Sequence, residues 1–252
     1  MKRQDVISVL LLGILAITGI RSQARAGTWV TIGPDSARGY LALPEGKGPH
    51  PALIVVHEYW GLAPWITGNA DEFARRGYVA LAVDLYGGKI AATPDEAMSM
   101  MRSVRPEAAS RLLEGADSFL RDRSDVIKGK IGSIGWCMGG GYSLRTALLN
   151  PTLAACVICY GMLVTDPEQV SKIPCPLLCI YGGKDKVFPA DTLRAFEKVA
   201  RMAKKRVTSH IYPEADHAFM NPNNKAGYRK GDADDAWTRI YAFLDGKLKK
   251  PM

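Results

Sequence analysis

The 252-residue sequence contains no internal repeat, no low-complexity tract and no linker long enough to separate two domains. These absences argue against repeat architectures and favour a single α/β domain over residues 27–252. Hydrophobic residues make up 47% of the chain and charged residues 23%, which excludes global disorder. A domain of this size buries a large core, so it needs neither disulfides nor a structural metal to stay folded.

The first 26 residues have the features of an export signal. Lys2 and Arg3 give a basic start, residues 6–20 are largely apolar, and Ala24-Arg25-Ala26 is the small-x-small pattern that a signal peptidase accepts. A retained membrane anchor is the alternative, but fifteen residues are fewer than the roughly 20 that span a bilayer. No cysteine follows the run, which argues against a lipoprotein. We expect a periplasmic or secreted protein with no stable membrane anchor after signal cleavage.

Charge of one sign is not concentrated anywhere in the sequence. The formal net charge of +8 falls to +5 without residues 1–26, which hold four Lys/Arg and one Asp. The basic residues that remain are scattered, apart from short groups at 204–206 and 247–250. Solvated helix ends explain these groups better than a nucleic-acid surface does, so we expect no nucleic-acid partner.

Cysteine is scarce, and its number is odd. In an oxidising compartment five cysteines leave at least one without an intramolecular partner. Cys156 and Cys159 have the spacing of a redox CxxC motif, so a thiol oxidoreductase is one alternative. They lie in an apolar segment typical of a buried strand, where residues three apart face opposite ways, whereas a redox motif begins a helix. We interpret Cys156, Cys159, Cys175 and Cys179 as core residues, with their disulfide state left open.

Apolar runs and segments of helical period alternate along the chain. The predicted strands are residues 28–33, 39–43, 52–56, 78–83, 130–134, 154–160, 176–181 and 207–212. The predicted helices are residues 66–76, 94–123, 140–149, 191–203 and 232–248, and we expect Pro106 to divide the second. This alternation predicts a mostly parallel, doubly wound sheet flanked by helices.

The strongest local feature is Gly135-Trp136-Cys137-Met138-Gly139, between a predicted strand and a predicted helix. It is the G-x-C-x-G form of the nucleophile elbow that is usually written with serine. So tight a turn strains the backbone of its central residue, and side chains at the two glycine positions would collide. The helix N-terminus favours a thiolate and later an oxyanion. A tight turn around an inert cysteine is the alternative interpretation.

Two later segments could complete a catalytic triad with Cys137. Gly182-Gly183-Lys184-Asp185 follows one predicted strand, and His217 follows the next. The order nucleophile, acid, base is that of an α/β-hydrolase, and both residues lie at carboxyl ends of strands, where open α/β sheets bind ligands. Asp185 could orient the imidazole of His217, which could take the proton of Cys137.

Other acids and histidines fit these roles less well. The competing acids either precede the nucleophile in sequence or lie too close to His217 to orient it (Asp84, Glu214 and Asp216). The other histidines lie in a loop, before the nucleophile or inside a strand (His50, His57 and His210). Ser133 does not form an elbow, because Ile131 stands where the first glycine should be.

With these residues in view, the sequence resembles the dienelactone hydrolase family of α/β-hydrolases over about residues 28–247. The resemblance rests on five segments: His57-Glu58-Tyr59-Trp60-Gly61, Asp84-Leu85-Tyr86, the elbow at 135–139, Gly182–Asp185 and Asp216-His217-Ala218-Phe219. It implies an α/β-hydrolase fold and hydrolysis of a small ester or lactone, without cofactor or metal.

The resemblance also implies further roles in the site. Glu58 would interact with the resting thiol and help to form the thiolate once substrate binds. The backbone N–H groups of Met138 and Tyr59 would form the oxyanion hole, in which one donor is worth about 2.7–4 kcal/mol. Trp60 and Tyr86 would line the pocket.

One departure from the family pattern concerns the substrate. Dienelactone-cleaving members bind the substrate carboxylate with two arginines, and the matching positions here are Gly88 and Asn221. Lys89 or Lys184 could substitute, but their spacing does not show it. The departure argues against dienelactone itself. A broad-specificity carboxylesterase and a catalytically silent binding protein of the same fold are the alternatives, and the natural substrate and oligomeric state stay open.

Overall fold

The computed structural model describes residues 26–33 and 37–250. The predicted signal segment therefore lies outside the described residues except for Ala26, and export remains a prediction. No helix within the described ranges is both long and apolar enough to cross a membrane.

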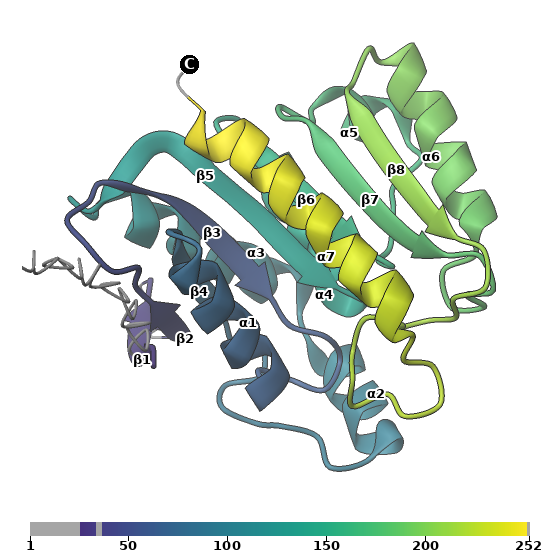
Figure 1. Ribbon diagram of the computed structural model, residues 1–252, viewed down its shortest axis with the longest axis horizontal. Helices are drawn as coiled ribbons and strands as arrows, with labels where there is room; N and C mark the ends of the chain where they lie inside the picture. Colours follow the sequence, from purple (N-terminus) through teal and green to yellow (C-terminus); the bar gives the residue numbers. More distant parts are fainter. Residues whose placement is uncertain (1–25, 34–36, 251–252) are drawn as a thin grey trace, which may run out of the picture.

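One eight-stranded sheet forms the centre of the molecule (Figure 1). Its strands lie in the order β1-β2-β4-β3-β5-β6-β7-β8. The first two pairings, β1 with β2 and β2 with β4, are antiparallel, and all others are parallel, which confirms the mostly parallel sheet. The strands are β1 (Thr28–Ile32), β2 (Ala37–Ala42), β3 (His50–Val56), β4 (Val79–Val83), β5 (Val126–Trp136), β6 (Ala155–Cys159), β7 (Leu177–Gly182) and β8 (Val207–Tyr212).

Each predicted helix is present, and Pro106 divides the second as expected. The helices are α1 (Pro64–Arg75), α2 (Pro94–Ser103), α3 (Pro106–Arg121), α4 (Met138–Leu149), α5 (Pro167–Ser171), α6 (Ala190–Met202) and α7 (Lys230–Leu244). The segment α7 continues into a π-helical turn, η1 (Asp245–Lys249). The sequence prediction missed α5, because five residues are too few to show a helical period.

Helices cover both faces of the sheet, so the strands are apolar on both sides. In β3, Leu53 and Val55 face the core under α1 and α7, whereas Ile54 and Val56 face the core under α3, α4 and α6. A strand buried on two sides cannot alternate polar and apolar residues. This burial explains the uninterrupted apolar runs in the sequence.

The cysteine pair of the CxxC segment is divided between the two faces. Cys156 lies in the core under α3, α4 and α6, and Cys159 lies in the opposite core. Both side chains are fully buried, and burial raises the pKa of the Cys156 thiol to about 11. This arrangement confirms the prediction from strand periodicity and argues against a redox role for the pair.

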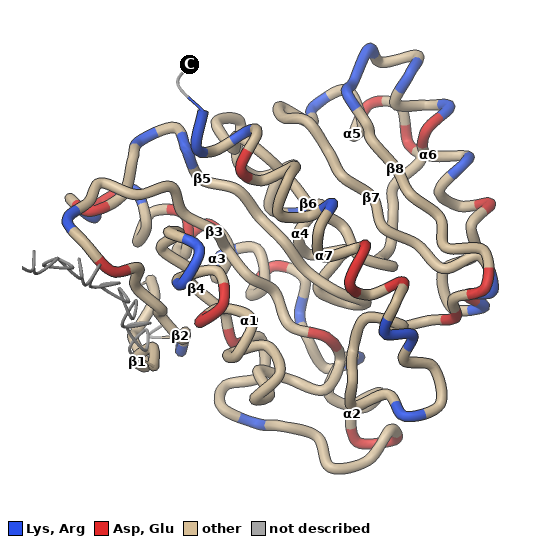
Figure 2. The backbone as a smooth tube through the Cα atoms, in the orientation of Figure 1, with Lys and Arg blue, Asp and Glu red and all other residues tan. Residues whose placement is uncertain are grey.

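Charged residues lie mainly at the ends of elements and on the outer helices (Figure 2). The strands β3, β4, β6 and β7 contain no Lys, Arg, Asp or Glu. On α6 and α7 the two signs are mixed, with ion pairs such as Arg194–Asp191 and Lys230–Asp234. The mixture fits solvated helix surfaces better than a surface that binds a polyanion.

Ile240 tests how strongly α7 is held against the sheet. Its side chain is fully buried in the core between α7 and the strands, so Ile240→Ala should lower the free energy of unfolding by about 2–5 kcal/mol in urea titrations. Met202→Ala is the control, because Met202 is 75% exposed on α6, and its effect should stay within about 0.5 kcal/mol. Equal effects of the two substitutions would contradict this packing.

Candidate active site

Cys137 occupies the turn between β5 and α4, in a backbone conformation that is rare for a residue with a side chain. Its φ is 54° and its ψ is −120°, which costs on the order of 1–3 kcal/mol and is typical of functional sites. The backbone N–H of Cys137 donates to the carbonyl of Cys159 at the end of β6 (3.0 Å). The turn is thereby fastened to the neighbouring strand, and Cys137 lines a cavity at the carboxyl edge of the sheet.

The two glycines of the elbow are required by close backbone contacts. A Cβ atom on Gly135 would lie 2.0 Å from the carbonyl oxygen of Gly139, and one on Gly139 would lie 2.3 Å from that of Val56. No side chain fits at such distances, as expected from the sequence. These contacts bring the N-terminus of α4 directly against the end of β3.

Asp185 and His217 come together on adjacent strand ends. Nδ1 of His217 lies 2.8 Å from Oδ2 of Asp185. The other carboxylate oxygen, Oδ1, accepts hydrogen bonds from the N–H groups of Val187 (2.7 Å) and Phe188 (2.9 Å). With both oxygens bonded and its side chain fully buried, Asp185 has a fixed direction from which to orient the imidazole.

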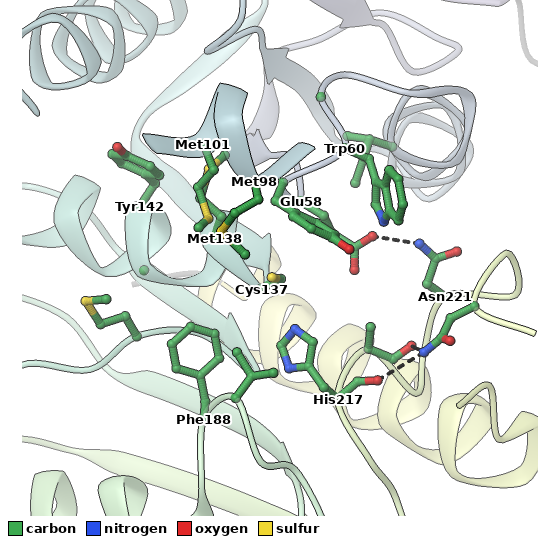
Figure 3. A pocket seen from close by; sticks show the side chains of 18 of the residues that line it. Glu58, Trp60, Met98, Met101, Cys137, Met138, Tyr142, Phe188, His217 and Asn221 are labelled. Carbon is green, nitrogen blue, oxygen red and sulfur yellow. Dashed lines mark hydrogen bonds between the residues drawn. The ribbon is translucent and has the colours of Figure 1, made fainter. Parts of the chain in front are cut away.

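The His217 ring is held between aromatic side chains and faces Cys137 (Figure 3). Its centroid lies 5.3 Å from that of Tyr160 and 5.6 Å from that of Phe188. Burial alone would lower the pKa of His217, but the hydrogen bonds to Asp185 and Cys137 and their negative charge raise it to about 10. The raised pKa makes the imidazole a stronger base beside the sulfur.

The competing acids have other partners, and the competing histidines lie in other parts of the fold. The side chain of Asp216 accepts from the backbone N–H of His217 (2.8 Å), not from its ring. Asp84 accepts from the N–H groups of Tyr86 and Gly88, and Glu214 forms an exposed ion pair with Lys184. The remaining histidines lie at the start of β3, after β3 and within β8 (His50, His57 and His210).

Glu58 is a buried acid next to this pair. Its Oε2 accepts a hydrogen bond from Asn221 Nδ2 (2.6 Å), and its Oε1 has no partner within the described residues. Burial raises its pKa to about 7, although the Asn221 amide and nearby His217 act in the opposite direction. Glu58 can therefore exchange a proton near neutral pH at the wall of the cavity.

The backbone N–H groups of Met138 and Tyr59 are free to bind an oxyanion. Neither amide donates to an acceptor in the described part of the chain. Met138 is the first residue of α4, whose first N–H groups have no partner inside the helix. Tyr59 follows Glu58 in the loop after β3, which the close contact at Gly139 brings against the elbow.

His57 positions the peptide that carries the Tyr59 amide. Its Nε2 accepts a hydrogen bond from the N–H of Leu85 (3.1 Å), so its Nδ1 carries the proton and donates to the carbonyl of Glu58 (2.6 Å). That carbonyl and the Tyr59 N–H belong to one peptide unit. This role could not be predicted from the sequence, because it depends on a contact between two separate loops.

The two aromatic residues expected in the pocket are placed differently. Trp60 lines the cavity, but Tyr86 is not among its lining residues. The Tyr86 ring packs against His57 with centroids 4.8 Å apart. Its hydroxyl donates to the carbonyl of Tyr59 (3.1 Å) and lies 3.3 Å from Met138 Sδ. Tyr86 therefore supports the loop that contains Tyr59 from outside the cavity.

Near the positions of the missing arginines, neither Arg38 nor the two candidate lysines, Lys89 and Lys184, line the cavity. The space beside Gly88 is filled by the guanidinium of Arg38, which stacks on Trp29. Lys89 does not line the cavity, and Lys184 pairs with exposed Glu214. Among the described residues, no group of three or more His, Cys, Asp and Glu side chains could hold a metal ion.

The sheet order, the strained elbow and the imidazole–carboxylate pair define an α/β-hydrolase. The model of the dienelactone hydrolase family matches residues 37–248, and the chain belongs to that family. It is a hydrolase that acts on ester or lactone bonds.

Relatives in sequence and structure agree with this assignment. "Protein usf" of Aquifex pyrophilus is 32% identical over 214 residues, 82% of this chain and 92% of the relative. A "putative carboxymethylenebutenolidase" of Methylorubrum extorquens is 31% identical over 215 residues, 80% and 74% of the two chains. The crystal structure of a "putative dienelactone hydrolase" from Klebsiella pneumoniae has 28% identity and a TM-score of 0.77, covering 86% of this chain and 97% of that one.

The buried carboxyl of Glu58 should make stability depend on pH. Its pKa rises from 4.5 when unfolded to about 7 when folded, so the folded protein binds more protons between those values. The free energy of unfolding should therefore fall as pH rises through this window, by about 3 kcal/mol from this group. Glu58→Gln removes this contribution, so its stability relative to wild type should be higher at pH 8 than at pH 4.5.

Urea titrations of the two proteins at both pH values measure this difference. Glu114→Gln, at an exposed position on α3, is the matched control, and its effect should stay within about 0.5 kcal/mol at either pH. A Glu58→Gln effect that is the same at pH 4.5 and pH 8 would show that the fold does not raise the pKa of this carboxyl.

Proposed function

We propose that the protein hydrolyses an ester or lactone through a Cys137–His217–Asp185 triad and an acyl-enzyme intermediate. The observation that carries the proposal is the 2.8 Å contact of Asp185 with the ring of His217, which faces a cysteine in an elbow conformation. The raised pKa of His217 favours transfer of the Cys137 proton to its imidazole. A free thiol is only a few per cent ionised at neutral pH, so this activation is needed.

In the first half of the reaction the Cys137 thiolate attacks the carbonyl carbon and forms a carbon–sulfur bond. The negative charge moves to the carbonyl oxygen, where the N–H groups of Met138 and Tyr59 stabilise it. When the intermediate collapses, the carbon–oxygen bond breaks. The His217 imidazolium then donates its proton to the leaving alkoxide, which departs as an alcohol or stays attached as the opened lactone.

In the second half water attacks the thioester. Neutral His217, oriented by Asp185, accepts a proton from the water as the new carbon–oxygen bond forms. The carbon–sulfur bond then breaks, the acid leaves, and the imidazolium–thiolate pair is restored. Glu58 completes the assignment as the acid that interacts with the resting thiol and helps to form the thiolate, because its carboxyl lies on the cavity wall and is held by Asn221.

A broad-specificity carboxylesterase would use the same steps and differs only in substrate range. A catalytically silent binding protein would have no need of strained backbone at Cys137 or of two unpaired amides beside it. The geometry therefore favours an enzyme over a silent member of the fold.

Replacement of the proposed nucleophile should abolish turnover and leave the fold intact. Cys137→Ala should lower kcat on p-nitrophenyl acetate by at least about 10³-fold, and the acylated protein seen by mass spectrometry after rapid quenching should be lost. Cys175→Ala is the matched control, because Cys175 is buried in the core away from the cavity, and its acyl adduct should persist. Full activity of Cys137→Ala would rule out covalent catalysis at this position.

Replacement of the orienting acid should change the pH dependence as well as the rate. Asp185→Asn should lower kcat/KM about 10²–10⁴-fold, and it should move the alkaline limb of the profile from near pH 10 to lower pH, because the carboxylate helps to raise the pKa of His217. The substrate should be an ethyl ester, assayed by released ethanol, because ethoxide needs the proton of His217 to leave.

Asp216→Asn is the control for this shift. Asp216 neighbours His217 but bonds only its backbone, so the alkaline limb should stay where it is in the wild type. A p-nitrophenyl ester has a leaving group that needs no proton. With this substrate, the loss of kcat/KM at alkaline pH should be smaller in the wild type and in both aspartate variants. An equal shift in both aspartate variants would contradict the role of Asp185 as the acid that orients His217.

A further inference from the structure

The cavity over Cys137 is larger than a small lactone requires. Its volume is about 1280 Å³, whereas ligand pockets commonly measure about 300–1000 Å³. The lining is mostly apolar, and it extends from the nucleophile to α2, which lies beyond the carboxyl ends of the central strands (Figure 1). Space of this kind suits a substrate with a large apolar part.

Flexible apolar side chains surround the nucleophile. Met98 and Met101 on α2 and Met138 on α4 lie together beside Cys137 (Figure 3), and Met162 also lines the cavity. Methionine is unbranched and polarisable, so it adapts to apolar groups of different shapes. The spacing of Met98 and Met101 places both on the same side of α2.

The rim of the cavity is apolar as well. Seven large hydrophobic side chains are exposed among the described residues, and four of them lie on this rim: Ile90, Met98, Met162 and Val187, between 36% and 64% exposed. They come from four different segments at the carboxyl edge of the sheet. A cluster of exposed apolar groups around one opening is characteristic of a binding surface. Here the cluster extends the apolar lining of the cavity from Cys137 to the molecular surface.

Charges in the cavity do not favour an anionic substrate at the reacting end. Glu58 and Asp216 line the cavity near His217. Arg145 lies eight residues beyond Cys137, about 12 Å along α4, and its guanidinium is bonded to Ser110 Oγ (2.8 Å) and the Pro106 carbonyl (3.4 Å). Lys225 donates to the carbonyl of Pro222 (3.3 Å). A carboxylate close to the scissile bond would therefore lie near two acids, whereas Arg145 lies further along α4.

We infer that the natural substrate is an uncharged carboxylic ester with a long or bulky apolar acyl group, which fills the cavity and reaches its rim. The inference rests on the proposed function of the same site and narrows its substrate class. The carbonyl lies at Cys137, and the acyl chain runs past the methionines of α2. Hydrolysis then yields an amphipathic acid that leaves through the same opening.

A series of p-nitrophenyl esters tests the inference separately from the proposed function. Burial of each methylene should raise kcat/KM about fourfold, so octanoate should exceed acetate by at least about 100-fold, mainly through a lower KM. A flat or falling series would overturn the inference while hydrolysis of acetate still supports the triad, and the apolar rim would then belong to a second copy or a partner protein. If no ester acylates Cys137, the proposed function fails first.

A charged analogue of the octanoate ester tests whether the acyl group of the substrate is uncharged. The p-nitrophenyl monoester of octanedioic acid has the same chain with a terminal carboxylate, and its kcat/KM should be at least about tenfold below that of the octanoate, because an unpaired charge must enter an apolar space. A preference for the monoester would overturn the inference and assign Arg145 as the group that binds it.

Substitutions at the rim connect the preference to this cavity. Met98→Gln with Met162→Gln should lower the octanoate-to-acetate ratio of kcat/KM by about tenfold, since two apolar contacts with the chain are lost. Met202→Gln is the matched control, at an exposed methionine on α6 that does not line the cavity, and its ratio should equal that of the wild type. An unchanged ratio in the double variant would place the chain elsewhere.

Discussion

The site depends on the backbone of Cys137, which is held in a conformation that most residues avoid. The strain is maintained by contacts on both sides: the carbonyl of Gly139 lies against Gly135, and Gly139 itself lies against Val56 at the end of β3. One close approach therefore does three things. It raises the sulfur above the sheet, leaves the Met138 amide unpaired, and brings the loop with Tyr59 alongside. A looser turn would separate these groups.

The charged groups around this turn are bonded to backbone amides and to a neutral side chain. The carboxylate of Asp185 is fixed by two backbone amides and stabilises the imidazolium of His217. Glu58 is held by a neutral amide, Asn221, in a buried position that raises its pKa to about 7. This neutral partner agrees with the apolar walls of the cavity.

Much of the fold was predictable, because its signals are local. Strands covered on both faces give uninterrupted apolar runs, as in β3, and Pro106 marks the division of α2 from α3. The contact of Asp185 with His217 was predictable, because the two residues follow adjacent strands, β7 and β8, after the elbow at Cys137. Their closeness follows from a parallel sheet, which brings the carboxyl ends of its strands to one edge.

Other features could not be predicted, because they depend on contacts between distant segments. Asn221 bonds Glu58 across 163 positions, and the sequence showed only that it was not arginine. Tyr86 was expected in the pocket, yet its hydroxyl supports Tyr59 from outside it. The helix α5 is too short for a period. For Asn221 and Tyr86 the deciding information is the direction or the partner of the side chain, which the spacing of residues in the sequence does not show.

The imidazole of His57 has a consequence that reaches beyond its own loop. The ring accepts a hydrogen bond from the N–H of Leu85 and donates one to the carbonyl of Glu58. Through this ring, the segment after β4 helps to orient the peptide that contains the Tyr59 amide. What matters at position 85 is the main-chain hydrogen, and many side chains are compatible with that demand. Proline is the exception, because it has no N–H group to donate to His57. The imidazole would then lose one of its two hydrogen bonds, and the Tyr59 amide would be held less firmly.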